Sequence, residues 1–238
     1  MTKLKSLSTV LALLMFVSVF ASCTKEDIKA FTDEEAVVLI ESSMQKSTGG
    51  MEETTAKYSE NLVNEIAVNE ACDEDHASSY PFSYSNALIT ADYVFDWAYM
   101  LSCNNLNIPT SADFTASSDG NYTTKRLTSN DNSSTAFIVT GLQPSVSSLT
   151  MNGVYTRNGT QVLTTNFNTR NISSALMIDL TDLEVAKSDF EIESGTGTIL
   201  LTVTAEGNVF TFEGEIVFLG DSNAALTLNG VTYDINLG

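Results

Sequence analysis

The sequence is poor in the residues on which much enzyme chemistry depends. It has 1 histidine, 3 cysteines and 3 prolines among 238 residues. The single histidine, His76, excludes most Ser-His-Asp triads, Cys-His pairs and zinc sites built from several histidines. The chain also contains no Gly-x-Ser-x-Gly motif, no phosphate-binding glycine-rich loop and no His-Glu-x-x-His motif. We therefore expect a protein that is not an enzyme and that needs no cofactor or metal.

Positive charge is also scarce. The chain has 11 basic and 30 acidic residues, and its formal net charge is −19 at pH 7. A field of this sign repels the phosphates of nucleic acids, so we expect no nucleic-acid partner. Hydrophobic residues make up 43 % of the chain, which indicates a folded globular protein and not a disordered stalk.

One long apolar run lies near the N-terminus. Lys3 and Lys5 precede the apolar residues 10–21, and small residues stand directly before Cys23. A basic start, an apolar centre and small residues at the end are typical of a secretory signal. The run has about a dozen residues, whereas a membrane-spanning helix needs roughly 20. We therefore expect residues 1–22 to be a cleaved signal peptide.

The end of this segment carries two short motifs. Phe20-Ala21-Ser22-Cys23 resembles the lipobox of bacterial lipoproteins, although Phe20 replaces the usual leucine or valine. Lys25-Glu26-Asp27 resembles the export signal of surface lipoproteins of Bacteroidota, a lysine followed by two acids. The resemblance covers only this stretch. It implies a lipid-anchored Cys23 that carries acyl chains such as palmitate, a tether over residues 23–31, and display at the surface of the outer membrane. The alternative is an ordinary signal peptide that ends by chance in a cysteine.

If Cys23 is lipidated, Cys72 and Cys103 are the two thiols that remain. Disulfides persist in the compartments outside the cytoplasm. We therefore predict a Cys72–Cys103 disulfide. Two free thiols or a metal-binding pair are the alternatives.

Residues 32–80 are predicted to form a helical hairpin and a connecting loop. Thr32 and Glu35 have the spacing of a capping box at the start of a first helix. Gly49-Gly50 is expected to end that helix, and a second helical pattern covers residues 52–71. The predicted apolar faces contain Ala36, Val37, Ile40 and Met44 in the first helix, and Tyr58, Leu62 and Ile66 in the second.

Residues 81–238 are predicted to form an antiparallel β domain. Apolar and polar residues alternate through several segments, of which residues 210–218 are the clearest. Hairpin-turn dipeptides are expected at Asp119-Gly120, Asn158-Gly159, Gly207-Asn208 and Asn229-Gly230. The predicted fold is mainly β: a helical hairpin followed by an antiparallel meander that forms a curved sheet or a barrel. A two-sheet sandwich is the alternative.

Four aromatic residues alternate along one predicted strand, at Tyr93, Phe95, Trp97 and Tyr99. Because a strand must bury one face, we interpret this stripe as core. The alternative is an exposed platform for sugar rings, formed by Tyr93, Trp97 and Tyr99.

Together these features predict an acidic, outer-membrane-anchored lipoprotein that faces the cell surface. We expect a structural or protein-interaction role, with an outer-membrane protein as the partner and the membrane contacted through the lipid anchor. A lipid- or glycan-binding β-barrel lipoprotein is the main alternative, and a hydrolase of unrecognised type is a third.

Overall fold

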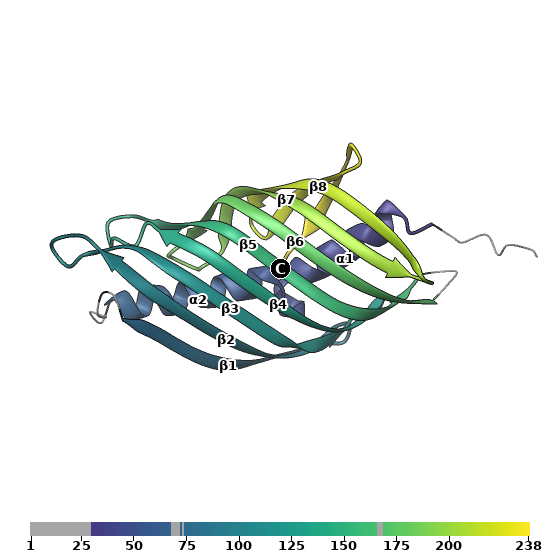
Figure 1. Ribbon diagram of the computed structural model, residues 1–238, viewed down its shortest axis with the longest axis horizontal. Coiled ribbons are helices and arrows are strands. Elements are labelled where there is room, and N and C mark those ends of the chain that lie inside the picture. Colours follow the sequence, from purple (N-terminus) through teal and green to yellow (C-terminus); the bar gives the residue numbers. More distant parts are fainter. Residues whose placement is uncertain (1–29, 68–71, 73, 166–168) are drawn as a thin grey trace, which may run out of the picture. The chain divides into compact units, whose positions relative to one another are not determined.

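Ten antiparallel strands follow one another in chain order through a single sheet (Figure 1). The strands are β1 (Asp75–Ser85), β2 (Thr90–Cys103), β3 (Pro109–Thr123), β4 (Leu127–Thr140), β5 (Ser148–Thr164), β6 (Thr169–Ala186), β7 (Ile192–Ala205), β8 (Asn208–Gly220), β9 (Asn223–Leu228) and β10 (Val231–Asn236). Each strand pairs with its neighbours in sequence, so β1 and β10 form the two edges. The predicted meander is confirmed. Its strands belong to one open, curved sheet, which corrects the alternatives of a closed barrel and a two-sheet sandwich.

The computed structural model describes residues 30–67, 72, 74–165 and 169–238. Residues 31–238 form a compact unit of their own. The lipobox-like motif, with Cys23, and the export-like motif Lys25-Glu26-Asp27 lie outside the described residues.

The side chains of the strands alternate between a buried and an exposed face. In β4 every second residue from Leu127 to Val139 is buried, and the residues between them are exposed. The same period in β2 buries Tyr93, Phe95 and Trp97. Because residues two apart in a strand lie on the same side, the sheet presents one continuous inner face to the core.

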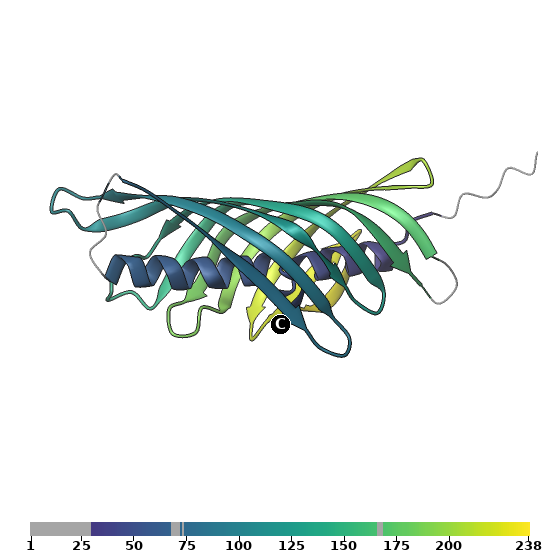
Figure 2. The ribbon, with the colours of Figure 1, turned by 90° about the horizontal axis from the view of Figure 1, so that it is seen from below.

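Two helices cover that inner face. They are α1 (Asp33–Met44) and α2 (Met51–Ala67), joined by a 3-10 turn at Lys46–Thr48. Figure 2 shows the sheet curving over both helices. The predicted helical hairpin is therefore present, and it shares one hydrophobic core with the sheet.

The start of α1 agrees with the predicted capping box. The Glu35 N–H donates to Thr32 Oγ1 at 3.2 Å, and the Thr32 N–H donates to Glu35 Oε2 at 3.0 Å. Between the helices, Gly49 has a φ of +61°, and a Cβ atom there would lie 2.7 Å from the Tyr93 ring. The glycine therefore allows the helical turn to approach β2 closely.

Several predicted boundaries and turns were wrong. The strands begin at Asp75, before the predicted start at residue 81. Asp119-Gly120 and Asn158-Gly159 lie inside β3 and β5 and form no turns. A Cβ atom on Gly120 would lie 2.5 Å from the Tyr93 ring, and one on Gly159 would lie 2.4 Å from the Asp131 side chain. Both glycines therefore give room to inner-face side chains, a regular use of glycine within strands.

Cys72 and Cys103 lie at disulfide distance, with their Cα atoms 5.8 Å apart. This agrees with the predicted pairing. The pair joins the segment that follows α2 to the last residue of β2. It therefore ties the helical layer to the sheet through two residues that are 31 positions apart in the sequence.

Replacing both cysteines, Cys72→Ser with Cys103→Ser, is expected to lower the free energy of unfolding by about 3 to 4 kcal/mol, because the open chain gains entropy when unfolded. Urea unfolding followed by circular dichroism measures the change. A reductant should destabilise the wild type and leave the double variant unaffected. Two alkylatable thiols in the native protein would contradict the pairing.

Candidate functional site

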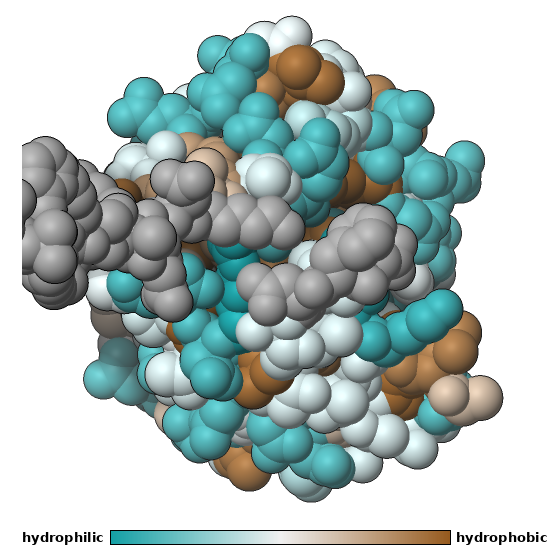
Figure 3. Space-filling model, turned by 90° about the vertical axis from the view of Figure 1, so that its right-hand side faces the viewer, coloured by the Kyte–Doolittle hydropathy of each residue, from teal (hydrophilic) through white to brown (hydrophobic). Residues whose placement is uncertain are grey.

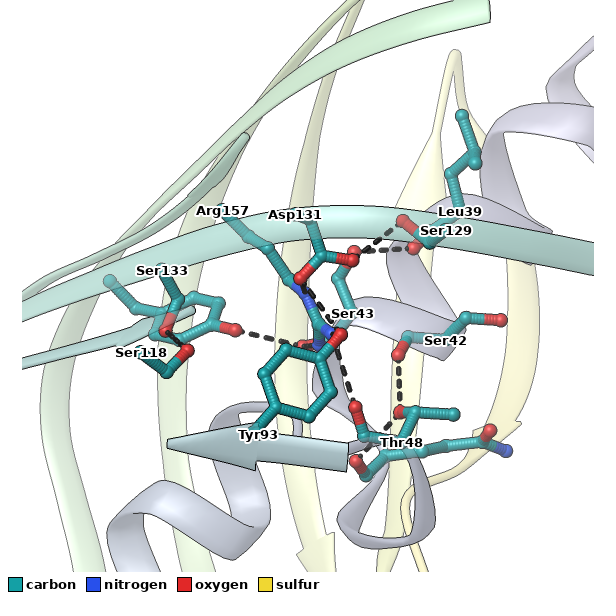
Figure 4. A network of polar contacts seen from close by, with 12 residues as sticks. Leu39, Ser42, Ser43, Thr48, Tyr93, Ser118, Ser129, Asp131, Ser133 and Arg157 are labelled. Carbon is teal, nitrogen blue, oxygen red and sulfur yellow. Dashed lines mark hydrogen bonds and ion pairs between the residues drawn. The ribbon is translucent and has the colours of Figure 1, made fainter. Parts of the chain in front are cut away.

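The inner face of the sheet carries a buried ion pair at its centre. Asp131 of β4 and Arg157 of β5 point toward the helices, and their side chains are 1 % and 3 % exposed (Figure 4). Arg157 Nε donates to Asp131 Oδ1 at 2.8 Å. A charge so deeply buried is costly unless its hydrogen bonds are satisfied, so the surrounding contacts determine what this pair does.

The guanidinium group of Arg157 binds the backbone of the helical turn. Nη1 donates to the Ser43 carbonyl oxygen at 3.2 Å, and Nη2 donates to the Thr48 carbonyl oxygen at 3.1 Å. Ser43 lies in the last turn of α1, where carbonyl groups have no partner within the helix. This last turn has no basic residue of its own. Arg157 therefore supplies the positive charge that stabilises the negative end of the helix dipole.

Three tyrosines surround the pair. The Tyr93 hydroxyl donates to Asp131 Oδ1 at 2.9 Å, and the Tyr155 hydroxyl donates to the Ser43 carbonyl oxygen at 3.1 Å. Arg157 Cζ lies 5.2 Å from the centre of the Tyr93 ring and 5.1 Å from that of Tyr122. Cation–π attraction at such distances adds to the stability of a buried guanidinium group.

Burial raises the pKa of Tyr93, Tyr122 and Tyr155 above the usual value for tyrosine. All three hydroxyls therefore stay protonated, and those of Tyr93 and Tyr155 act as hydrogen-bond donors. The second carboxylate oxygen of Asp131 accepts from the Ser129 hydroxyl at 2.6 Å. The charges of Asp131 and Arg157 are thus paired within the network. We infer that the network holds the helices against the sheet.

A second arginine of the sheet holds the opposite end of α1. Arg170 of β6 pairs with Glu35 at 3.5 Å, and the two side chains are 1 % and 7 % exposed. Glu35 lies in the first turn of the helix, where a negative charge is favourable. The sheet therefore contacts α1 through one arginine at each end, each of them matched to the local charge.

Glu52 is a third buried acid, at the start of α2. It is 2 % exposed, and its Oε1 accepts from the Ser222 hydroxyl at 2.9 Å. Burial raises the pKa of the Glu52 carboxyl group. The charged form of Glu52 is therefore disfavoured in the folded protein.

The predicted aromatic platform is part of the core. Tyr93, Trp97 and Tyr99 are 3 %, 6 % and 3 % exposed. The Trp97 and Tyr99 rings stack 5.6 Å apart, and Trp97 also contacts Tyr58 of α2 edge-on at 6.4 Å. A sugar platform needs exposed ring faces. The burial corrects that alternative and agrees with the core interpretation.

Arg157, Asp131 and Arg170 were not singled out from the sequence, and one signal could have found two of them. Arg157 has the same parity along its strand as Leu149, Met151 and Tyr155, which are all buried. Arg170 likewise shares the parity of the buried Ile172 in β6. An arginine at an inward position is a candidate for a buried ion pair.

The described residues contain no cluster of three or more histidine, cysteine, aspartate or glutamate side chains placed to hold a metal ion. Among those same residues, no helix combines the length and apolar character needed to cross a bilayer. Comparisons with protein families, with curated proteins and with solved structures gave no match.

We predict that Arg157→Met lowers the free energy of unfolding by about 3 to 5 kcal/mol, because Asp131 is left buried without its partner. Adding Asp131→Asn should recover part of that loss, since neither buried charge then remains. Urea unfolding of both variants measures the difference.

Arg126→Met serves as the control, because Arg126 is exposed in the loop between β3 and β4. Its effect should stay within about 0.5 kcal/mol. Equal losses in Arg157→Met and Arg126→Met would show that Arg157 holds no essential contact.

Glu52→Gln tests the raised pKa of the buried carboxyl group. A folded-state pKa above the unfolded one means that wild-type stability falls as the pH rises, from about pH 4.3, the ordinary glutamate pKa, through the raised value. The glutamine variant lacks this fall, so its stability relative to wild type should increase with pH over that window. Unfolding curves at several pH values measure this. A difference between the two proteins that stays flat across this window would contradict the assignment.

Proposed function

We propose that this protein is an outer-membrane-anchored lipoprotein that faces the cell surface and has a structural or protein-interaction role. The observation that carries the proposal is the motif Phe20-Ala21-Ser22-Cys23 followed after a short polar stretch by the first residue of the folded unit. That residue, Phe31, is buried and contacts the rings of Phe210 and Phe212 in β8. A lipid on Cys23 would thus hold a folded body close to the membrane.

The charge distribution supports a body that faces water. In the described strands the basic residues are Arg157 and Arg170, and both are buried in ion pairs. The exposed strand faces carry acids and small polar residues, with apolar side chains such as Val94, Ile138 and Val217 among them. On the side of the molecule shown in Figure 3, hydrophobic residues form separate patches among hydrophilic ones. Such a surface suits an aqueous environment next to a membrane.

An interaction role is supported by apolar residues held at the tips of hairpins. Leu106, between β2 and β3, is 78 % exposed. The side chain of Asn104 shapes this loop, because its Oδ1 accepts from the N–H groups of Leu106 at 2.9 Å and Ile108 at 3.1 Å. Leu88, between β1 and β2, is 67 % exposed, and Asn86 holds its loop in the same way. Ordered loops that expose leucine suit contact with another protein.

The carrier alternative receives less support. A lipid or glycan carrier needs an apolar cavity within its barrel, and here the helices cover the inner face of an open sheet. The Tyr58 ring of α2, for example, lies 4.3 Å from the Phe114 ring of β3. This arrangement favours a function at the outer surfaces of the protein.

The proposal predicts that the wild-type chain incorporates labelled palmitate and sediments with outer membranes, and that Cys23→Ala abolishes both properties. The control is the double variant Cys72→Ser with Cys103→Ser, which should keep its label, because those cysteines are not the acceptor. Radiolabelling and membrane fractionation make the two measurements. An unlabelled wild type, or a Cys23→Ala variant that still sediments with membranes, would overturn the anchor.

A further inference from the structure

The two edges of the sheet are treated differently by the rest of the chain. The edge at β10 is contacted by α1 and the following turn. Gln45 Nε2 donates to the Asn236 carbonyl oxygen at 3.0 Å, and the Asn236 N–H donates to Glu41 Oε1 at 3.2 Å. The Lys46 N–H donates to the Leu237 carbonyl oxygen at 2.7 Å. Elements of the same chain thus cover the C-terminal end of this edge.

No described residue contacts the edge at β1 in this way. The Asn86 N–H donates to the Ile89 carbonyl oxygen at 2.9 Å, so these two residues form a hydrogen-bonded pair at the hairpin. Bonded and non-bonded pairs alternate along an antiparallel ladder, so Ala77, Ser79, Pro81 and Ser83 direct their backbone groups away from β2. All four are exposed, and no hydrogen bond from the part of the chain that the structure describes reaches those groups.

The usual protection of an exposed edge is also weak here. Natural edges are kept short or carry charges, lysine above all. β1 has 11 residues against 6 in β10, and it has no charged side chain between Ala77 and Ser85. Pro81 is the one protective feature, because it lacks an N–H, but its carbonyl group still points outward. This edge can therefore accept another strand with the loss of one hydrogen bond.

A row of aromatic side chains would gain cover from an added strand. Tyr80 and Phe82 are half-buried on the inner face of β1, and Tyr84 is 37 % exposed. Tyr80 stacks on Phe95 at 5.0 Å, and Phe82 meets Phe95 edge-on at 6.1 Å. An eleventh strand would place side chains beside this row and bury the side of the rings that now faces solvent. Side-chain burial would then add to the backbone hydrogen bonds, as in strand addition generally.

The charges around β1 select the kind of partner. Asp96 lies opposite Ser79, and Asp92 lies opposite Ser83 and accepts from its hydroxyl at 2.7 Å. On the helical side, burial and the nearby charge of Glu53 raise the pKa of Tyr80. The lysine of α2, Lys57, is paired with Glu60 at 2.7 Å. A second copy of this acidic chain would bring like charges together, whereas a basic segment would meet opposite ones.

We propose that the β1 edge binds an extended, basic segment of a partner protein, which pairs with Ala77–Ser83 as an eleventh strand. This inference rests on the proposed interaction role and does not depend on the lipid anchor. Backbone pairing would supply affinity, and the acids on β2 and α2 would favour lysine or arginine at alternate positions of the segment.

The test uses the full chain purified from the expressing cells and two synthetic ten-residue peptides, one alternating threonine with lysine and the other threonine with glutamate. The lysine peptide should bind at least about tenfold more tightly, measured by fluorescence anisotropy. Ala77→Pro with Ser79→Pro removes two outward N–H groups and should weaken binding about tenfold or more. The matched variant Ala77→Thr with Ser79→Thr keeps both N–H groups and every charge, so its affinity should stay within about twofold.

Hydrogen exchange gives a second readout that needs no variant. In the wild type, the amides of Ala77, Ser79 and Ser83 should gain protection when the lysine peptide is added. Absence of binding, equal binding to the proline and threonine variants, or no added protection would each overturn the proposal. A dimer that the proline variant abolishes in sedimentation velocity would also overturn it, in favour of a second copy. Palmitate labelling of Cys23 is measured separately, so failure of the edge and failure of the anchor are distinguishable.

Discussion

The buried charge of Arg157 is the constraint on which the arrangement of sheet and helices depends. A guanidinium group this far from water is tolerable only if carboxylate and carbonyl groups surround it, and Asp131, Ser43 and Thr48 provide them. Those groups come from β4, from α1 and from the turn after it. A single side chain on β5 thus fixes the position of the helical turn against the middle of the sheet.

The same requirement explains residues that otherwise look out of place in strands. Gly120 and Gly159 leave space for the Tyr93 ring and the Asp131 side chain. Ser129 sits at an inward position of β4 because its hydroxyl donates to the carboxylate. The centre of the inner face is therefore polar, where a simple two-layer core would be apolar. Apolar packing resumes on either side, through the aromatics of β2 and the aliphatic residues of β6 and β7.

The helical layer also decides what the outside of the molecule can do. α1 and the turn after it contact the end of the β10 edge, whereas the backbone of the longer β1 edge receives no hydrogen bond from the described residues beyond its pairing with β2. Both strand arginines are used inside, so the outer faces are left acidic. Exposed loop tips, an open edge and an acidic surface are the features that support the proposed interaction role.

Local patterns in the sequence determined much of this structure. The capping box of Thr32 and Glu35, the alternation in β2 and β8, and the pairing of Cys72 with Cys103 all depend on short-range geometry or on the number of available thiols. Whether the sheet closes was decided only by the tertiary structure, because closure depends on the sum of small twists between strands and on what fills the inner face. Likewise, Asn158-Gly159 is locally typical of a turn. Only the approach of Asp131 from the neighbouring strand β4 shows why a glycine stands there. The buried charges belong to the same class: their partners are far apart in the chain, so no local period could have paired Arg157 with Asp131 and the end of a helix.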